Sequence, residues 1–497
     1  MRFAALLCAT CLAGVCTAAA PDDRMPDHAA THPYPLGDKG DLWLMAGQSN
    51  MGGYALMKRE TEPDPRILFF AAPSDQWVVT KDPVHNLFFR GTAFIPEGTE
   101  GAEAADRAQD VSKAVLGTGP CLFFGKHLIR YTNRPIGLIG VASGGWMAQV
   151  WDPAKMDLEK MPPRPYLYGP MIQRVIQAGG YGKLKGMVWD QGGSDGSQKP
   201  SASKDYEKNL IAFIRAVRRD TGNDKLPVIV VQMGRMVASA VPGAPGKSLG
   251  GEPYDDLYAA YTEGWERVRE AQRRVAETLE NVHLVPSADL YPLADPVHWD
   301  FEAYERLGPR VAEVALSQVY KLPGHGTPIK LQSFEVAERR DPRTGGPIPG
   351  HHQTTLRVRF SGVSGQLRAA GRATGFSLRV PGMTPEQARG GAPVIFAVEF
   401  DPDDPAAVLL HVTGYPEKLH ERGVVLCYGA GLDPSINITD ERDMAIPTFG
   451  PVEIPAPKEV AVAPNAPHDA EVEITIRKNV EYRPGGVGIE WRLDYAK

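Results

Sequence analysis

Between residues 41 and 320, short apolar segments without charges alternate with longer amphipathic segments. An uncharged apolar run of about four to eight residues is typical of a strand that is buried on both faces. Apolar residues spaced three and four positions apart are typical of a helix with one buried face. Strands that alternate with helices form a parallel sheet that is covered on both sides. We therefore predict an α/β fold with three α/β/α layers, of the flavodoxin-like kind.

The sequence predicts where these elements lie. The predicted strands are Leu42–Ala46, Pro135–Ala142, Leu184–Trp189, Pro227–Gln232 and Val282–Pro286. The predicted helices are Pro120–Tyr131, Leu167–Ala178, Tyr206–Arg219, Asp255–Leu279 and a last one within Phe301–Tyr320. The stretch 54–116 is rich in Pro, Gly and acidic residues, so we expect long loops that line a cleft. His85 in this stretch is a candidate ligand contact or a turn residue.

After Lys321–Pro328, a linker with Gly and Pro, the apolar period changes to two. This pattern, with Gly, Pro and Asp between the segments, predicts an all-β domain, a sandwich. We predict four parts: a signal peptide (1–20), an N-terminal arm (21–40), an α/β domain (41–322) and the β-sandwich (329–497). The predicted strands of the sandwich are Thr355–Phe360, Phe376–Val380, Pro393–Phe400, Ala407–Val412, Gly423–Tyr428, Glu471–Ile476 and Gly488–Leu493.

Residues 1–20 combine Arg2 with an apolar stretch and small residues that end at Ala20. This pattern is typical of a secretory signal peptide, so we predict a secreted or periplasmic protein whose mature chain has no membrane segment. Val15, which stands where a small residue would be expected, argues against a lipid anchor at Cys16. The formal net charge of −6 and the lack of a long basic run argue against a nucleic-acid partner.

Two of the five cysteines, Cys121 and Cys427, lie outside the predicted signal peptide. The sequence favours two buried free thiols and leaves a bridge between them open. No cysteine spacing resembles a zinc site, and no metal is predicted. The adjacent His351 and His352 are interpreted as an exposed loop pair, and the acidic cluster 401–404 as a solvated turn.

Polar residues follow the predicted strands. Ser49 comes after the first strand, Ser143-Gly144-Gly145 after the second and Gln191 after the third. The carboxyl ends of parallel strands meet at one edge of the sheet, where ligands bind. Asp295 and His298 come after the last strand. The Asp-x-x-His spacing can place a carboxylate against the imidazole Nδ1 and leave Nε2 as a general base for the serine.

Acyl transfer also needs N–H donors that face the oxyanion. The candidates are the backbone N–H groups of Ser49 and Gly144 and the side-chain amide of Gln191. A rival nucleophile is Ser194, because GGSDG at 192–196 matches the G-x-S-x-G nucleophile elbow. An elbow serine leads directly into a helix, whereas 198–201 separates Ser194 from the next helical pattern. We therefore favour Ser49.

Several segments are similar to signature blocks of the SGNH hydrolases and, more narrowly, of the sialate O-acetylesterase-like carbohydrate esterases. They are GQSNM at 47–51, IGLIGVASGG at 136–145, VWDQG at 188–192 and DPVH at 295–298. The resemblance covers roughly 41–320 and extends faintly to 427–451. It implies removal of acetyl groups from carbohydrate hydroxyls, with no metal or organic cofactor.

The resemblance also implies roles for single residues. Ser49 would be the nucleophile, His298 the base and Asp295 its orienting acid. Gly144 and Gln191 would complete the oxyanion hole. One position departs from the family pattern, because Gly193 stands where members usually carry Glu.

Four further residues are predicted to contact substrate. Gln48 and Asn50 flank Ser49, and Trp146 and Trp151 follow the glycine pair, where they can stack on a sugar or pack in the core. Arg235 is interpreted as a salt-bridge partner, with substrate contact as the alternative. Two other functions stay open: a carbohydrate-binding protein on an esterase scaffold, and an esterase or thioesterase for lipid or aryl esters. The sugar and the oligomeric state are not determined by the sequence.

Overall fold

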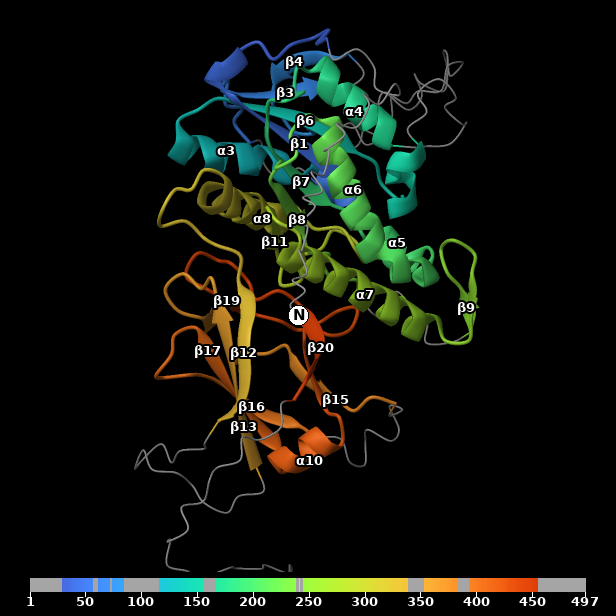
Figure 1. Cartoon of the computed structure of the whole chain (residues 1–497), viewed down its shortest axis with the longest axis vertical. Coiled ribbons are helices and arrows are strands. Elements are labelled where there is room, and N and C mark those ends of the chain that lie inside the picture. Colours follow the sequence, from blue (N-terminus) through green and yellow to red (C-terminus); the bar gives the residue numbers. More distant parts are fainter. Residues whose placement is uncertain are drawn as a thin grey trace, which may run out of the picture. The chain divides into compact units, whose positions relative to one another are not determined.

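The computed structural model describes residues 29–56, 61–71, 74–84, 116–155, 167–237, 241, 245–337, 353–382 and 393–454. They belong to one compact unit that ends at Ala456. A seven-stranded sheet organises the first part, here called the α/β region (Figure 1). Its order is β11 (Val282–Val285), β8 (Val228–Val231), β7 (Leu184–Asp190), β1 (Asp41–Gly47), β6 (Ile136–Ala142), β3 (Ile67–Ala71) and β4 (Gln76–Val79). Only β3 and β4 pair antiparallel, so the predicted α/β fold is confirmed with one antiparallel edge strand added.

Strand β1 lies in the centre of the sheet, and all its residues are buried. Trp43 and Met45 join an apolar cluster on one face, whereas Leu44 and Ala46 join a cluster on the other. Both faces are covered, which explains why the strand carries no charge after Asp41. Figure 1 shows the helices of the two faces on opposite sides of the sheet. They are α3 (Pro120–Thr132) and α8 (Phe301–Val314) on the first face, and α4 (Tyr168–Gln177), α6 (Tyr206–Asp220) and α7 (Leu257–Thr278) on the second.

The prediction of long loops within 54–116 is wrong where four strands lie, whereas 57–60, 72–73 and 85–115 fall outside the described residues. β3 and β4 extend the sheet beyond β6, and β2 (Ala55–Leu56) pairs with β5 (Leu116–Thr118). β3 is a five-residue apolar run whose Ile67 and Phe70 are fully buried. A run of five apolar residues between polar neighbours is too short to show a clear apolar period in the sequence. The strand pairs with β6, a partner that the local sequence does not reveal.

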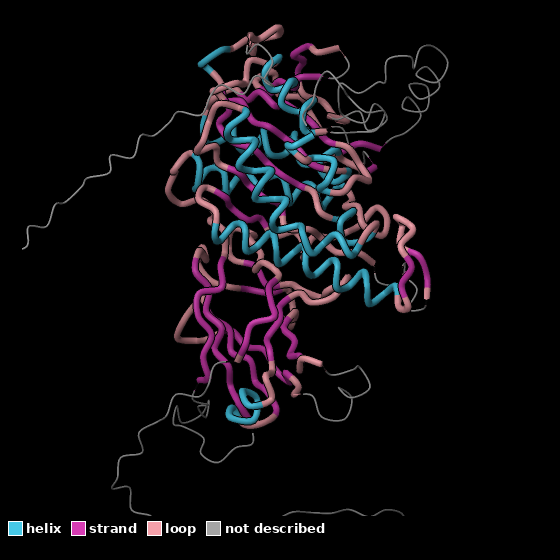
Figure 2. Tube along the Cα trace, turned by 45° about the vertical axis from the view of Figure 1, so that its right-hand side comes forward, coloured by secondary structure: helices cyan, strands magenta, loops and turns pink. Residues whose placement is uncertain are grey.

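The second part, residues 329–454, is here called the C-terminal region. A four-stranded antiparallel sheet and a three-stranded antiparallel sheet contribute side chains to one apolar cluster, in which Phe360 lies against Phe449 at a ring distance of 6.3 Å. The first consists of β12 (Lys330–Ala337), β13 (Gln353–Ser361), β17 (Ala407–Thr413) and β16 (Ile395–Phe400). The second consists of β15 (Phe376–Arg379), β18 (Val425–Tyr428) and β20 (Phe449–Glu453), and β14 (Arg368–Ala369) pairs with β19 (Ile438–Thr439). Figure 2 shows these strands with the short helix α10 (Pro416–Glu421) at one end.

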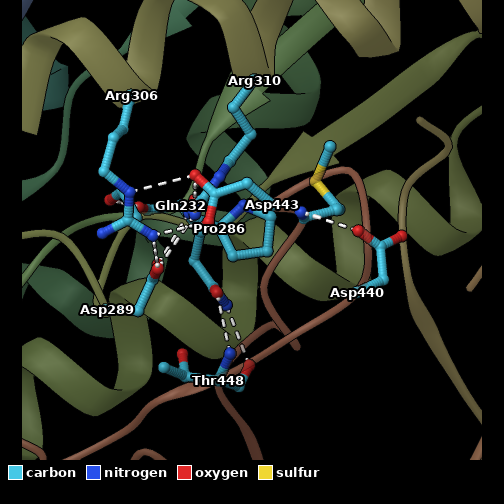
Figure 3. A network of polar contacts seen from close by, with 10 residues as sticks. Gln232, Pro286, Asp289, Arg306, Arg310, Asp440, Asp443 and Thr448 are labelled. Carbon is cyan, nitrogen blue, oxygen red and sulfur yellow. Dashed lines mark hydrogen bonds and ion pairs between the residues drawn. The ribbon is translucent and has the colours of Figure 1, made fainter. Parts of the chain in front are cut away.

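Charged and amide side chains join the C-terminal region to the α/β region (Figure 3). Arg306 and Arg310 on α8 both contact Asp443, and Arg310 also forms a bidentate pair with Asp289. Gln232, just after β8, exchanges two hydrogen bonds of 2.9 Å with the backbone of Thr448. These contacts bring the loops of the second region against the first.

Short elements complete the described chain. The helical ones are η1 (Gly37–Lys39), α1 (Ser49–Gly52), η3 (Ala148–Trp151), η4 (Pro153–Lys155), α5 (Gly193–Ser197), η5 (Pro200–Asp205) and η7 (Ala315–Val319), and β9 (Gly246–Lys247) pairs with β10 (Pro253–Tyr254). Cys121 and Cys427 are both free and buried. None of the helices in the described ranges is long and apolar enough to cross a membrane. The predicted signal peptide, His85, the pair 351–352 and the predicted strands beyond 454 lie outside the described residues.

Candidate active site

The turn after β1 brings Ser49 to the carboxyl edge of the sheet. Gly47 has a φ of +153°, and a Cβ there would lie 2.0 Å from the backbone oxygen of Asp190. Only glycine permits this close approach between β1 and β7. The same oxygen accepts a hydrogen bond from Gln48 N at 2.8 Å, and α1 begins at Ser49. The strand, the glycine and the one-turn helix together determine where the hydroxyl lies.

Ser49, His298 and Asp295 lie in one chain of hydrogen bonds. Ser49 Oγ is 2.7 Å from His298 Nε2, and His298 Nδ1 is 2.6 Å from Asp295 Oδ2. The other carboxylate oxygen, Oδ1, accepts the backbone N–H groups of Val297 and His298, each at 2.8 Å. The Asp-x-x-His turn therefore orients its own imidazole toward a serine that lies 249 positions away in the sequence.

The electrostatics of Asp295 keep it ionised. Burial would raise its pKa, but the hydrogen bonds from the His298 side chain and from Val297 N outweigh burial and lower the pKa to about 2. A carboxylate at Nδ1 holds the tautomer in which Nε2 accepts a proton.

Asn50 and Tyr54 contact the hydrogen-bonded chain of Ser49, His298 and Asp295 without belonging to it. Asn50 Oδ1 accepts a hydrogen bond from Tyr304 Oη at 3.0 Å, and its amide nitrogen donates to Val297 O at 3.3 Å. Asn50 therefore joins the serine turn to the histidine loop. The ring of Tyr54 stacks on His298 at a centroid distance of 4.0 Å. Neither Tyr304 nor Tyr54 is predicted from the sequence, because no local pattern connects these residues to the site.

The predicted oxyanion donors fare differently. Gly144 lies next to Ser49, because a Cβ on it would be 3.3 Å from Ser49 Cβ. Gln191 is directed elsewhere: its amide nitrogen donates to Asp195 Oδ2 at 2.6 Å and to Trp146 O at 3.2 Å. Both amide hydrogens are therefore used, which speaks against the expected role of Gln191. The competing acceptor, Asp195, was not recognised in the sequence.

Ser194 shows a second departure from expectation. It lies within α5, so the argument that no helix follows the G-x-S-x-G segment is wrong. Its hydroxyl oxygen accepts a hydrogen bond of 3.5 Å from Gln198 Nε2, and no histidine in the described ranges bonds to it. Ser194 thus lacks a base, although its backbone setting is that of an elbow.

Of the two alternatives for Trp151, stacking on a sugar and packing in the core, the structure favours packing in the core. The side chain is 1% exposed and packs edge-on against Trp189 at 5.0 Å. Trp146 is half-buried and packs against the same apolar cluster. Burial of a large apolar side chain in the core stabilises the fold at all times, whereas a contact with substrate would cover that side chain only while substrate is bound.

A cavity of about 210 Å³ opens above the serine. Ser49, His298, Gln48 and Asn50 line it at one side. The other lining residues include several in or next to α5, several after β8 and one on α7: Gly193, Ser194, Gln198, Met233, Arg235, Met236 and Trp265. Asp190 also borders the cavity, and burial raises its pKa to about 7. Neither Trp146 nor Trp151 is among the described residues that line the cavity, whereas Trp265 is.

A buried serine that is hydrogen-bonded to an oriented imidazole lies beside a cavity at the edge of the α/β sheet, which makes this place the candidate active site. The family model for "carbohydrate esterase, sialic acid-specific acetylesterase" matches residues 39–317, which is more than half of the chain. The chain therefore belongs to this family and is a carbohydrate acetylesterase, a carboxylic ester hydrolase. No curated protein matches the sequence.

Solved structures are similar to this chain to different extents. XAC1771, a carbohydrate acetylesterase from Xanthomonas citri, is 18% identical, with a TM-score of 0.53 over 82% of this chain and 80% of its own. Est24, a carbohydrate acetylesterase from Sinorhizobium meliloti, is 11% identical, with a TM-score of 0.29 over 56% of this chain and 99% of its own. At this identity the first likeness supports the fold alone. It agrees with a seven-stranded α/β sheet followed by β sheets.

Proposed function

We propose that this enzyme removes O-acetyl groups from carbohydrate through an acetyl-enzyme on Ser49. The observation that carries the proposal is the pair of hydrogen bonds, 2.7 Å and 2.6 Å, that links Ser49, His298 and Asp295. Ser49 Oγ attacks the ester carbonyl carbon while its proton passes to His298 Nε2. The imidazolium then gives this proton to the departing sugar oxygen. Asp295 stays ionised and stabilises the imidazolium.

Water completes the cycle. His298 Nε2 takes a proton from a water molecule as the water oxygen attacks the acetyl carbonyl. The imidazolium then gives this proton to Ser49 Oγ as the bond between Oγ and the acetyl carbon breaks, which frees acetic acid and restores the serine hydroxyl and the neutral histidine. The developing oxyanion needs N–H donors within about 3 Å. The backbone N–H groups of Ser49 and Gly144 are the proposed donors, supported by the closeness of these two residues. Gln191 is not included, because its amide bonds to Asp195 and Trp146.

The test measures acetate release from a panel of acetylated glycans, together with turnover of p-nitrophenyl esters of increasing chain length. We expect acetate release from at least one glycan and a strong preference for acetyl over longer acyl groups. Glycan binding without acetate release would favour a binding protein instead. A preference for long chains would favour an esterase for lipids.

We also propose a secreted or periplasmic location, with residues 1–20 as the signal peptide. The support is the sequence pattern: Arg2, an apolar stretch and the small residues before Pro21. Mass spectrometry of the protein from an extracellular or periplasmic fraction tests it. A mature chain that retains Met1 would contradict it.

A further inference from the structure

The loop between β18 and β19 of the C-terminal region reaches the wall of the active-site cavity. Met236 N donates to Leu432 O at 2.9 Å. Arg235 Nε donates to Asp433 Oδ1 at 2.5 Å, and its Nη2 donates to Pro434 O at 3.2 Å. Arg235 and Met236 both line the cavity that contains Ser49. A wall of the substrate cavity is therefore fixed by residues nearly 200 positions further along the chain.

The contacts leave one end of Arg235 unengaged. Nε and Nη2 bond to the C-terminal loop, whereas Nη1 forms no hydrogen bond with the residues that the structure describes. The side chain is 21% exposed, so the guanidinium is neither buried in the core nor loose in solvent. A guanidinium held through two of its nitrogens presents its remaining N–H groups in a fixed direction. The sugar hydroxyl, ring and carbonyl oxygens of an acetylated carbohydrate are suitable acceptors.

We propose that Arg235 binds the carbohydrate part of the substrate and that Asp433 is the positioning residue that orients it. This inference rests on the proposed function, since it places the leaving sugar beside the part of the cavity wall that Arg235 and Met236 form. The C-terminal region then completes the substrate site of the α/β region. Asp433 itself touches neither the ester nor Ser49.

The chain offers a matched control for Asp433. Asp443 is also a loop aspartate of the C-terminal region, and it also pairs with arginines of the α/β region (Figure 3). Its partners, Arg306 and Arg310, are absent from the described lining of the cavity. Loss of Asp443 weakens the attachment of the region, whereas loss of Asp433 also releases a cavity side chain.

The experiment compares Asp433→Asn and Asp443→Asn in the full chain. The substrates are p-nitrophenyl acetate, which has no sugar, and the glycan from the panel that is deacetylated fastest. We expect Asp433→Asn to raise KM for the glycan about tenfold, as for one lost charge-assisted hydrogen bond, with kcat little changed. On p-nitrophenyl acetate both constants should change less than about threefold. Asp433→Glu should restore part of the affinity, and Asp443→Asn should leave both KM values near those of the parent chain.

A double-mutant cycle identifies the route of the effect. If Asp433 acts through Arg235, Asp433→Asn adds little once Arg235→Gln is present. The inference is overturned if the two substitutions are additive, if Asp433→Asn resembles Asp443→Asn on the glycan, or if both substrates lose affinity equally. A parent chain that releases no acetate overturns both this inference and the proposed function. A parent chain that is active on both substrates isolates the failure to Asp433.

Discussion

The loops after β1 and β7 each contain a Gly-x-Ser segment that leads into a short helix, with Ser49 as the first residue of α1 and Ser194 as the second residue of α5. Gly47-Gln48-Ser49 and Gly192-Gly193-Ser194 each begin with a glycine of positive φ, +153° and +147°. Each places a serine in a one-turn helix, and the two strands are neighbours in the sheet. Both serines line the same cavity. The backbone therefore presents two hydroxyl groups in similar ways.

The partners of the two serines differ. Ser49 meets the imidazole of His298, whose other nitrogen meets a carboxylate. Ser194 meets an amide, and the nearby carboxylate of Asp195 bonds to Gln191 and to Ala148 N. A serine hydroxyl is a weak nucleophile until a base takes its proton. A glycine–serine turn therefore determines where a hydroxyl lies, whereas the side chain that contacts the hydroxyl in the folded protein determines whether it can act as a nucleophile.

The largest expected effect separates the two serines. Ser49→Ala should lower kcat on p-nitrophenyl acetate by at least about 10⁴-fold, because the proposed acyl-enzyme forms on the Ser49 hydroxyl. Ser194→Ala should keep most of the activity, since no histidine among the described residues bonds to the Ser194 hydroxyl. Circular dichroism of both variants controls for folding. An inactive Ser194→Ala alongside an active Ser49→Ala would reverse the assignment.

The second prediction separates the two aspartates. Asp295→Asn should lower kcat about 10⁴-fold, because an amide at Nδ1 favours the wrong tautomer of His298. Asp195→Asn should lower kcat about tenfold at most, as for the loss of one hydrogen bond outside the chain that links Ser49, His298 and Asp295. Steady-state kinetics at neutral pH measures both. Equal losses would mean that Asp195 is part of the catalytic relay.

Local patterns were sufficient for much of this molecule. The buried strands and amphipathic helices of the α/β region follow from apolar periodicity, and β1, β6 and β7 lie within a residue or so of their predicted limits. The Asp-x-x-His turn was found because its two partners are three positions apart. Ser49 was found because a serine follows a buried strand.

Competition between distant groups was not visible in the sequence. The amide of Gln191 was expected to face an oxyanion, but Asp195 and Trp146 O are closer acceptors. The sequence allows Trp151 to stack on a sugar or to pack in the core, and the structure favours the core. Nothing local relates Arg235 to Asp433, because the pair forms only when two sheets are already packed. Such choices depend on tertiary geometry rather than on periodicity.

The third prediction concerns Asp190, where β7 meets the turn of β1. Burial raises its pKa from 3.8 to about 7, and its Oδ2 has no hydrogen-bond partner among the described residues. The folded chain then holds a proton that the unfolded chain releases, so this group's contribution to stability falls as pH rises from about 4 to 7. In Asp190→Asn that contribution is gone. The free energy of unfolding, relative to the parent, should rise by up to about 1.4 kcal/mol per pH unit in this window.

Urea unfolding of both chains at several pH values between 4 and 7 measures this difference. Asp195, whose pKa burial also raises to about 7, still titrates in the variant and provides the internal comparison. A pH-independent difference between the two chains would mean that Asp190 is ionised in the folded protein.

The smallest expected effect comes from Gly193, the middle residue of the second turn and the position where the family usually has Glu. A Cβ there would lie 3.0 Å from Gln48 Nε2, the end of a flexible side chain, so Gly193→Glu should fold. The new side chain displaces Gln48, whose Oε1 accepts a hydrogen bond from Gly192 N, and it narrows the cavity that Gly193 lines. We expect a change in KM for glycan of about fivefold, worth about 1 kcal/mol, with kcat on p-nitrophenyl acetate nearly constant. A large fall in that kcat would show instead that the second turn supports the chemistry of Ser49, and the two loops would then act as one unit.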